Sequence, residues 1–233
     1  QQIIEILRKE AVPALGCTEP VACALACAKC KEVLGGVPER LKVLVSGNIY
    51  KNGMGVGIPG TGMVGLPIAA ALGAVCGKSE YGLEVLKEVN EGDNLQRAKD
   101  MLGQVTVSLK EDAPDKLYAE ALATKGNDTV KVIIAHTHTN IVLVEKNGEE
   151  IFKREFRLDT SKPEDKGPEL SVKRIWDFVH EVDVKDIEFV LQGAEMNKAI
   201  SAEGLNSEYG LQIGKTLKEN IDKGLLEDDL LNR

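Results

Sequence analysis

Hydrophobic positions near the start of the chain recur at helical spacing. Ile3, Ile4 and Leu7 share one face of a segment that predicts a short helix over residues 3–10. A second helix is predicted over residues 19–34, where small residues alternate with larger ones. Because alanine side chains allow two backbones to approach, we expect another element to pack closely against this second helix.

The pattern of alternating apolar and polar residues predicts strands further along the chain. The first covers residues 41–46. After residue 102 the spacing of apolar residues changes from helical to alternating. Asn147-Gly148 is a strong hairpin signal because both residues tolerate positive φ. Short connections favour antiparallel pairing, so the prediction is an antiparallel sheet of five to six strands. The later strands are predicted over residues 105–110, 117–124, 129–137, 140–146 and 150–157.

Segments in which apolar residues have helical spacing come before and after the predicted strands in the sequence. The predicted fold class is therefore α+β with N- and C-terminal helices. A polar stretch with two prolines, residues 159–168, is predicted as an exposed linker. We divide the chain into a helical segment over 1–102, the sheet over 103–160 and helices over 161–233, forming one compact unit of a longer protein. Further helices are predicted over residues 66–75, 81–89, 93–102, 171–180, 184–202 and 211–223.

The composition narrows the classes of function. A net charge of -8 and a pI near 5.1 argue against nucleic-acid binding, which needs clustered lysine and arginine. No apolar run reaches the ~18 residues that span a membrane. Four of the five cysteines lie between positions 17 and 30, which is not a disulfide framework in a chain of this length. We therefore expect a protein of the reducing cytoplasm that contacts neither nucleic acid nor membrane.

Cys17 lies where the second helix is predicted to begin. Thr18 suits the helix cap, Glu19 the positive helix end and Pro20 the first turn. Backbone N–H groups at a helix start favour a thiolate, the form of cysteine that attacks electrophiles and binds metals. The alternative is a small buried residue at a turn, because free cysteine is among the most buried residue types.

Three further cysteines have the spacing of some cluster-binding motifs but lie on a predicted helix. Cys23, Cys27 and Cys30 fall on one helical stripe, and the first and last would lie about 10 Å apart by helical rise. A helix cannot wrap these three thiols around one cluster. We therefore predict that they pack in the core.

The glycine-rich stretch over residues 47–65 ends in a G-x-G-x-x-G sequence. A dinucleotide site would need a strand directly before this motif, and the preceding residues are too rich in glycine for one. Backbone N–H groups at Gly60, Thr61 and Gly62 suit instead the carboxylate of a small substrate. A tight loop packed against the helix over 66–75 is the other interpretation.

Two polar groups are candidates for a small-molecule site. His136, His138 and Asn140 alternate, so we expect them on one face at a strand end. No nearby residues complete a metal site with these histidines, and a solvated edge strand is the alternative. Lys51 could pair with a carboxylate or act as a base, with Asn48 and Asn52 beside it.

Four segments in order resemble the L-cysteine desulfidase family, also called UPF0597, which is related to iron–sulfur L-serine dehydratases. They are PALGCTEP at residues 13–20, NGMGVGIPGTGMVGLP at 52–67, HTNIV at 138–142 and EGL at 203–205. Family members are about twice as long, so the resemblance implies that this chain is the N-terminal part of such a protein. The C-terminal half would be its partner, and a homodimer is a further possibility.

The resemblance implies a lyase that splits L-cysteine into hydrogen sulfide, pyruvate and ammonia at a [4Fe-4S] cluster. Cys17 matches the N-terminal cluster ligand, and the other ligands belong to the absent half, so the chain alone should be inactive with an absent or incomplete cluster. We assign catalytic roles to Lys51 and His138. An L-serine or L-threonine dehydratase, a non-catalytic amino-acid-binding domain and a nucleotide-binding protein are the alternatives, in that order. The expected substrate contacts are Thr18, Glu19, Asn48, Asn52, Gly60, Thr61, Gly62 and Asn140.

Overall fold

The computed structural model describes residues 1–154, 170–208 and 211–229. Its contacts divide the chain into two units: a sheet unit, Pro13–Pro163, and a helical unit formed by Gln1–Val12 together with Glu164–Arg233. The linker predicted over residues 159–168 lies outside the described residues. The division of the chain at residues 102 and 160 remains a prediction.

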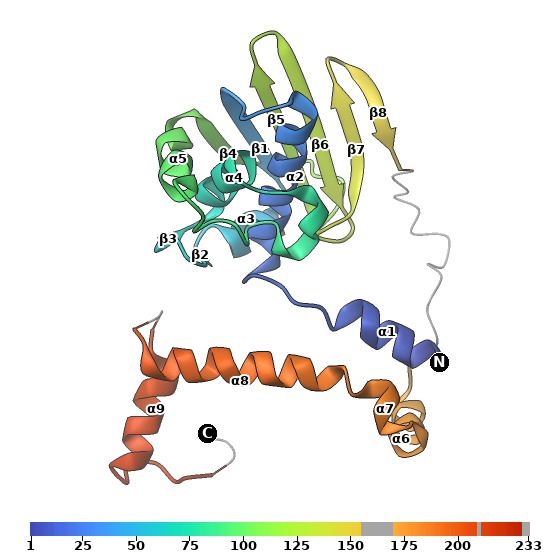
Figure 1. Ribbon diagram of the computed structural model, residues 1–233, viewed down its shortest axis with the longest axis vertical. Helices are drawn as coiled ribbons and strands as arrows, with labels where there is room; N and C mark the ends of the chain where they lie inside the picture. Colours follow the sequence, from blue (N-terminus) through green and yellow to red (C-terminus); the bar gives the residue numbers. More distant parts are fainter. Residues whose placement is uncertain (155–169, 209–210, 230–233) are drawn as a thin grey trace. The chain divides into compact units, whose positions relative to one another are not determined.

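The sheet unit is built on a mixed six-stranded sheet with the strand order β4-β1-β5-β6-β7-β8 (Figure 1). Four of the five strand pairs are antiparallel, but β1 and β4 run parallel, with Val43 opposite Val107. The prediction of a wholly antiparallel sheet is therefore wrong for this pair. A helical crossover separates the two strands and returns the chain in the same direction. The strands are β1 (Arg40–Val45), β4 (Val105–Leu109), β5 (Tyr118–Lys125), β6 (Asp128–Ala135), β7 (Ile141–Lys146) and β8 (Glu149–Lys153).

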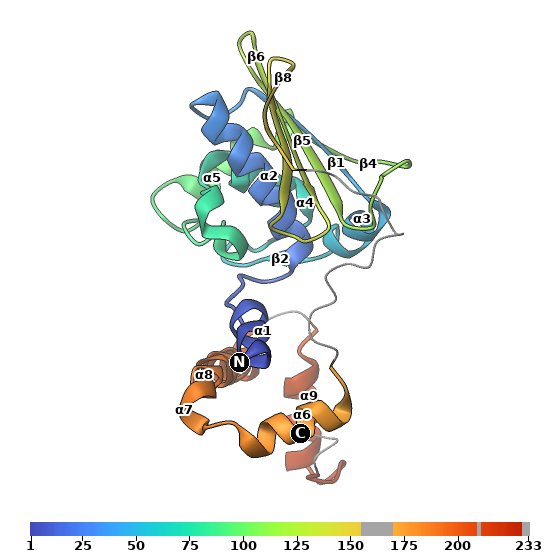
Figure 2. The same cartoon turned by 90° about the vertical axis from the view of Figure 1, so that its right-hand side faces the viewer.

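Helices cover one face of this sheet, as Figure 2 shows for α2, α4 and α5. The alternation along β1 explains why the helices pack on this face: Leu41, Val43 and Val45 point to one side and are buried, while Lys42 is exposed. Polar pairs occupy the opposite face, such as Lys131 and Glu145 at 2.6 Å. The helical segments of the unit are α2 (Thr18–Leu34), α3 (Gly47–Gly53), α4 (Leu66–Val75), α5 (Asn94–Met101) and the 3-10 turns η1 (Ser79–Glu84) and η2 (Leu102–Gln104).

The helices α2 and α4 form the centre of the core. A Cβ atom added at Gly73 of α4 would overlap the backbone carbonyl of Ala24 in α2, so the two backbones touch. The close approach predicted for the alanine-rich helix is confirmed. Cys23, Cys27 and Cys30 have no exposed surface, which confirms their prediction as core residues.

One local prediction in the sheet unit differs from the structure. The helix predicted over residues 81–89 is replaced by η1 and turns, because Gly82 has a φ of 53° and interrupts the helix. The glycine-rich stretch contains α3 and then a small hairpin of β2 (Gly57–Ile58) and β3 (Met63–Val64).

The helical unit contains five helices in its described residues. Arg8 of α1 stacks on the ring of Phe189 at 4.2 Å, and Arg174 of α6 donates a 3.0 Å hydrogen bond to Gln2. The single helix predicted over residues 184–202 is two helices. None of the helices in the described ranges combines the length and apolar character needed to cross a membrane. The elements are α1 (Gln2–Glu10), α6 (Val172–Glu181), α7 (Val184–Ile187), α8 (Val190–Asn206) and α9 (Ile213–Asp222).

Candidate functional site

The candidate site begins at Cys17, which is the N-cap residue of α2. The prediction that Thr18 caps this helix is wrong, because Thr18 is already the first helical residue. The Cys17 side chain makes a different contact: its thiol donates a 2.8 Å hydrogen bond to Oε2 of Glu19. A thiol and a carboxylate are therefore paired at the start of the central helix.

This pairing changes the expected ionisation of Cys17. Partial burial and the hydrogen bond to Glu19 raise the pKa of the Cys17 thiol above its usual value. The prediction of a thiolate favoured by the helix start is therefore wrong for the chain as it stands. Burial opposes ionisation of Glu19, but hydrogen bonds from Cys17 and Asn52 outweigh it and lower the pKa of this carboxyl. The pair thus consists of a neutral thiol and a charged carboxylate.

Asn52 connects a second segment of the chain to this pair. Its side-chain amide, in the last turns of α3, donates a 2.9 Å hydrogen bond to Oε1 of Glu19. Both oxygens of the carboxylate are therefore engaged, one by Cys17 and the other by Asn52. The structure brings together these three predicted site residues, although Asn52 is 33 positions from Glu19.

His138 adds a third segment, the loop between β6 and β7. A 3.2 Å hydrogen bond joins its Nε2 atom to the hydroxyl of Thr18. Burial lowers the pKa of His138, with only partial compensation from the charge on Glu19. At neutral pH the ring is uncharged, and one of its nitrogens is free to accept a proton.

The prediction that His136, His138 and Asn140 share one strand face is wrong. Strand β6 ends at Ala135, and His136 has a φ of 70°, so the alternation stops there. His136 turns to Asp115, 2.7 Å away, instead of to the candidate site. Asn140 closes the loop through a 3.0 Å hydrogen bond to the carbonyl of Ala135 and accepts another from Arg154.

The glycine hairpin lies next to the Cys17 segment. A Cβ atom added at Gly16 would come within 3.1 Å of the side chain of Pro59, which precedes the tip of the hairpin. Gly60 and Gly62 are exposed with positive φ, so their backbone is accessible. The Thr61 side chain is buried and bonded within the hairpin, to the carbonyl of Ile58 and the N–H of Met63.

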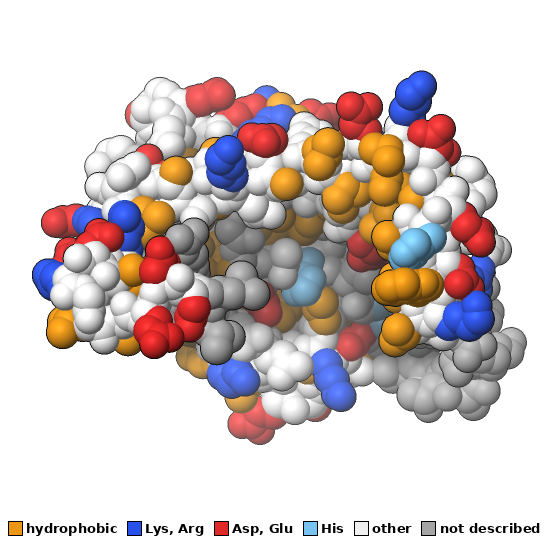
Figure 3. All heavy atoms as spheres, turned by 90° about the horizontal axis from the view of Figure 1, so that it is seen from below, with side chains coloured by type: hydrophobic (Ala, Val, Ile, Leu, Met, Phe, Trp, Pro, Cys, Tyr) orange, Lys and Arg blue, Asp and Glu red, His pale blue; other side chains and the backbone are white. Residues whose placement is uncertain are grey.

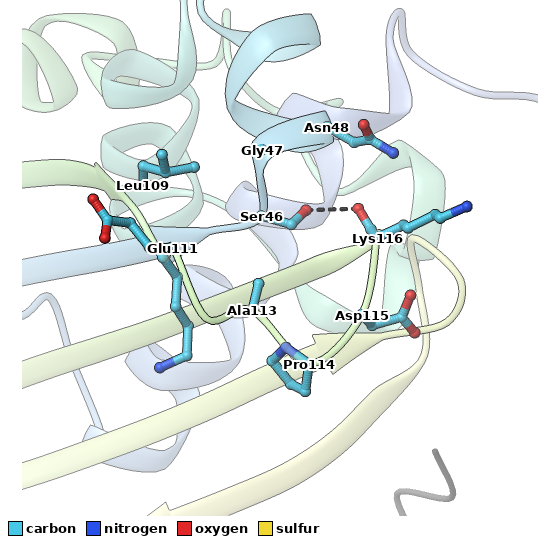
Figure 4. Close-up of a pocket in the computed structure, with 10 residues that line it drawn as sticks. Ser46, Gly47, Asn48, Leu109, Glu111, Ala113, Pro114, Asp115 and Lys116 are labelled. Carbon is cyan, nitrogen blue, oxygen red and sulfur yellow. Dashed lines mark hydrogen bonds between the residues drawn. The ribbon is translucent and has the colours of Figure 1, made fainter. Parts of the chain in front are cut away.

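Two of the predicted site residues, Lys51 and Asn48, form no part of this cluster. Lys51 is exposed in the last turn of α3. Asn48 lines a different cavity of about 450 Å³ between the start of α3 and the loop after β4 (Figure 4). There Ser46 donates a 2.7 Å hydrogen bond to the carbonyl of Lys116. Cys17, Glu19 and Asn52 do not line this cavity, so Asn48 is not part of their cluster.

The described residues do not supply a complete set of ligands for an iron–sulfur cluster. All five cysteines are free thiols, but only Cys17 has an accessible side chain, because the other four are buried. No group of three or more histidine, cysteine, aspartate or glutamate side chains is arranged to hold a metal ion within the part of the chain that the structure describes. A complete cluster ligand set therefore does not fit the described residues, although Cys17 suits the role of a single ligand.

Comparisons with known proteins identify relatives by sequence but no solved structure that matches. The chain is 47% identical over 235 residues to a UPF0597 protein of Dichelobacter nodosus, a match that covers all of this chain and 54% of the relative. UPF0597 proteins of Actinobacillus pleuropneumoniae and Parabacteroides distasonis are 46% and 45% identical over 100% and 97% of this chain, and 54% and 53% of their own lengths. No family model and no solved structure matches. The chain spans about half the length of the curated relatives that it matches.

Proposed function

We propose, on the premise that this chain belongs to the UPF0597 family, that it supplies one part of the active site of an iron–sulfur lyase acting on L-cysteine. The reaction would be β-elimination to hydrogen sulfide, pyruvate and ammonia. One observation carries the proposal: Cys17, the one accessible thiol, lies at a helix start where Glu19, Asn52 and His138 meet from three segments of the chain.

In this proposal Cys17 is a ligand for one iron. A cysteine binds metal as a thiolate, so its proton must leave. Oε2 of Glu19 lies 2.8 Å from the sulfur, and the lowered pKa of this carboxyl keeps it charged. On binding iron, the pKa of the thiol would fall far enough for its proton to pass to this neighbouring oxygen. Asn52 orients the carboxylate by holding its other oxygen. Glu19 is thus a proton acceptor, and Asn52 is its positioning residue.

The remaining candidate residues divide according to their present contacts. His138 is neutral and half-buried, which suits a base that removes a proton from the substrate, and Thr18 orients its ring. Lys51 and the exposed backbone of Gly60 and Gly62 are free to meet the carboxylate of an amino acid. Thr61, Asn48 and Asn140 are omitted from the proposed substrate contacts, because they are bonded elsewhere or line another cavity.

The cofactor of this proposal is a [4Fe-4S] cluster, which when bound would polarise the leaving group of the substrate. Its other cysteine ligands would come from the part of a family-length protein that this chain does not span. The chain alone would then be inactive. We place the protein in the reducing cytoplasm because its five cysteines are all free thiols.

The test uses two polypeptides: this chain, and the region of the Dichelobacter nodosus relative that this chain does not match. After anaerobic reconstitution of the mixture with iron and sulfide, release of sulfide and pyruvate is measured with L-cysteine, L-serine and L-threonine. We expect turnover of L-cysteine, abolished by Cys17→Ser and retained by Cys76→Ser, which changes a buried thiol outside the site.

Other outcomes would change the assignment. Preferential turnover of L-serine or L-threonine would favour a dehydratase of the same cluster type. Equal activity of the Cys17→Ser variant would refute the proposed ligand. Saturable calorimetric binding of cysteine to the iron-free chain, with no turnover by the mixture, would favour a non-catalytic amino-acid-binding domain.

A further inference from the structure

The described residues of the helical unit form no hydrophobic core of their own. Among the described residues of α1 and α6–α9, none is buried, whereas the sheet unit has an extensive buried core. A group of helices is stable in water only when its apolar faces are covered. The helical unit therefore presents apolar surface that must be covered from outside the unit.

Helix α6 shows this most clearly. Four of its five apolar residues, all except Phe178, follow the spacing i, i+3, i+4, i+7, which places them on one face. All four are exposed: Val172 by 85%, Ile175 by 46%, Trp176 by 65% and Val179 by 61%. Seen from below in Figure 3, hydrophobic side chains gather toward the right of the view, where α6 and α7 lie. A continuous apolar stripe of this kind is typical of an interface.

Helix α8 is uncovered along most of its length. Every residue from 191 to 200 is exposed, including Leu191, Met196 and Ile200, the last by 70%. Only three of the 17 residues of α8 are charged, Glu195, Lys198 and Glu203. A helix with so few charged residues is not stable when fully exposed to water. Helix α8 therefore needs a partner surface to cover it, as α6 does.

We propose that the apolar faces of α6 and α8 bind the region of a family-length protein that this chain does not span. The relatives provide the argument, because matches to this chain account for only 51–54% of their length. The remaining region is nearly as long as the chain itself. A region of that length is long enough to form its own core and to bury two helix faces.

Charge argues for this occupant over a second copy of the chain. Residues 170–229 contain seven lysines and arginines but thirteen aspartates and glutamates, a net charge of -6. Two copies meeting through this unit would bring like charges together, which disfavours association. The fitting partner is therefore an apolar surface with a basic rim. This inference uses family membership and the exposed faces, and it does not depend on the lyase chemistry.

Trp176 provides a direct test because it is the only tryptophan in the chain. This chain is titrated with the unmatched region of the Dichelobacter nodosus relative, produced as a separate polypeptide. Covering α6 should shift the emission of Trp176 to shorter wavelength, protect it from acrylamide quenching and give a one-to-one complex by light scattering. Ile200→Glu should weaken binding at least tenfold. Ile151→Glu, a change at a 55% exposed residue of β8, is the matched control and should leave binding unchanged.

Three results would overturn the proposal. The first is a blue-shifted, protected Trp176 in a homodimer of the chain alone, which would assign the faces to a second copy. The second is an unchanged Trp176 spectrum at saturating concentrations of the second polypeptide. The third is an equal loss of binding in the Ile151→Glu and Ile200→Glu variants, which would place the interface elsewhere.

Discussion

The carboxylate of Glu19 accepts a 2.9 Å hydrogen bond from the side chain of Asn52, and this contact ties the start of α2 to α3. The other carboxylate oxygen accepts a hydrogen bond from the thiol of Cys17. A carboxylate held from both sides keeps its orientation toward the sulfur. The local order of the site therefore depends on the Glu19 side chain.

Replacing Glu19 by glutamine should make Cys17 more reactive. The hydrogen bond to the Glu19 carboxylate and its charge both contribute to the raised pKa of Cys17, and glutamine removes the charge, so the thiol pKa should fall. More thiolate is then present at each pH. The pH profile of iodoacetamide alkylation reports this shift for Cys17 alone, since the other four thiols are buried.

The controls for this experiment are Cys17→Ser, which should abolish alkylation of the folded chain, and Glu111→Gln, which changes an exposed carboxylate beside the cavity that Asn48 lines. An alkylation midpoint that stays in place or moves to higher pH in Glu19→Gln would contradict the proposed pairing.

His138 should make folding stability depend on pH in mildly acidic solution. Burial lowers its pKa in the folded state, so the unfolded chain binds more protons below the usual value of 6.5. This contribution to stability is fully present above pH 6.5 and is lost as the pH falls through the folded-state pKa. The urea midpoint should therefore drop between pH 7.5 and 5.5, and His138→Gln should reduce that drop. An equal drop in both proteins would show that His138 does not titrate as described.

Replacing Gly73 by alanine should destabilise the sheet unit, although glycine to alanine in a helix usually stabilises by about 1 kcal/mol. The added methyl would overlap the carbonyl of Ala24, and overpacking of this kind costs about 1–3 kcal/mol. Urea unfolding measures the change. Gly103→Ala, where no atom lies within 4 Å, is the control and should stay within about 0.5 kcal/mol of the parent. A stabilised Gly73→Ala variant would mean that α2 and α4 do not touch.

Cys17 and Cys27 should respond differently to replacement by serine. Cys27 has no exposed surface and packs among apolar side chains, so a hydroxyl there costs about 1–3 kcal/mol of unfolding free energy. Cys17 is partly exposed, and a serine hydroxyl can still donate to Glu19, so the cost should stay within about 0.5 kcal/mol. Equal losses in the two variants would indicate that Cys17 is also a core residue.

Sequence patterns predicted the elements of the sheet unit better than their arrangement. The helix predicted over residues 66–75 is found with the same bounds as α4, and α2 differs from its prediction by one residue. Periodicity depends only on neighbouring positions, which explains this agreement. The parallel pairing of β1 with β4 depends on the direction of a crossover more than 50 residues long, which periodicity does not encode.

Local patterns also predict only part of the candidate site: they indicate individual residues but not the contacts between them. Cys17, Glu19 and Asn52 were all singled out, but no local pattern shows that one carboxylate bonds to both partners. The positive φ of His136 is the clearest case, because alternation predicted an extended strand where the backbone turns. The thiolate prediction for Cys17 is wrong because burial and the hydrogen bond to Glu19, neither of which a helix-start pattern encodes, raise the pKa of the thiol.

Iron and sulfide analysis after anaerobic reconstitution tests most directly whether Cys17 supplies one ligand of a cluster completed from outside this chain. We expect well under four irons per molecule for the chain alone, and this expectation is the central prediction. We also expect about four irons and four sulfides once the unmatched region of the Dichelobacter nodosus relative is added, and loss of most of this iron in Cys17→Ser but not in Cys76→Ser. Four irons bound by the chain alone, or full iron content in the Cys17→Ser mixture, would contradict these expectations.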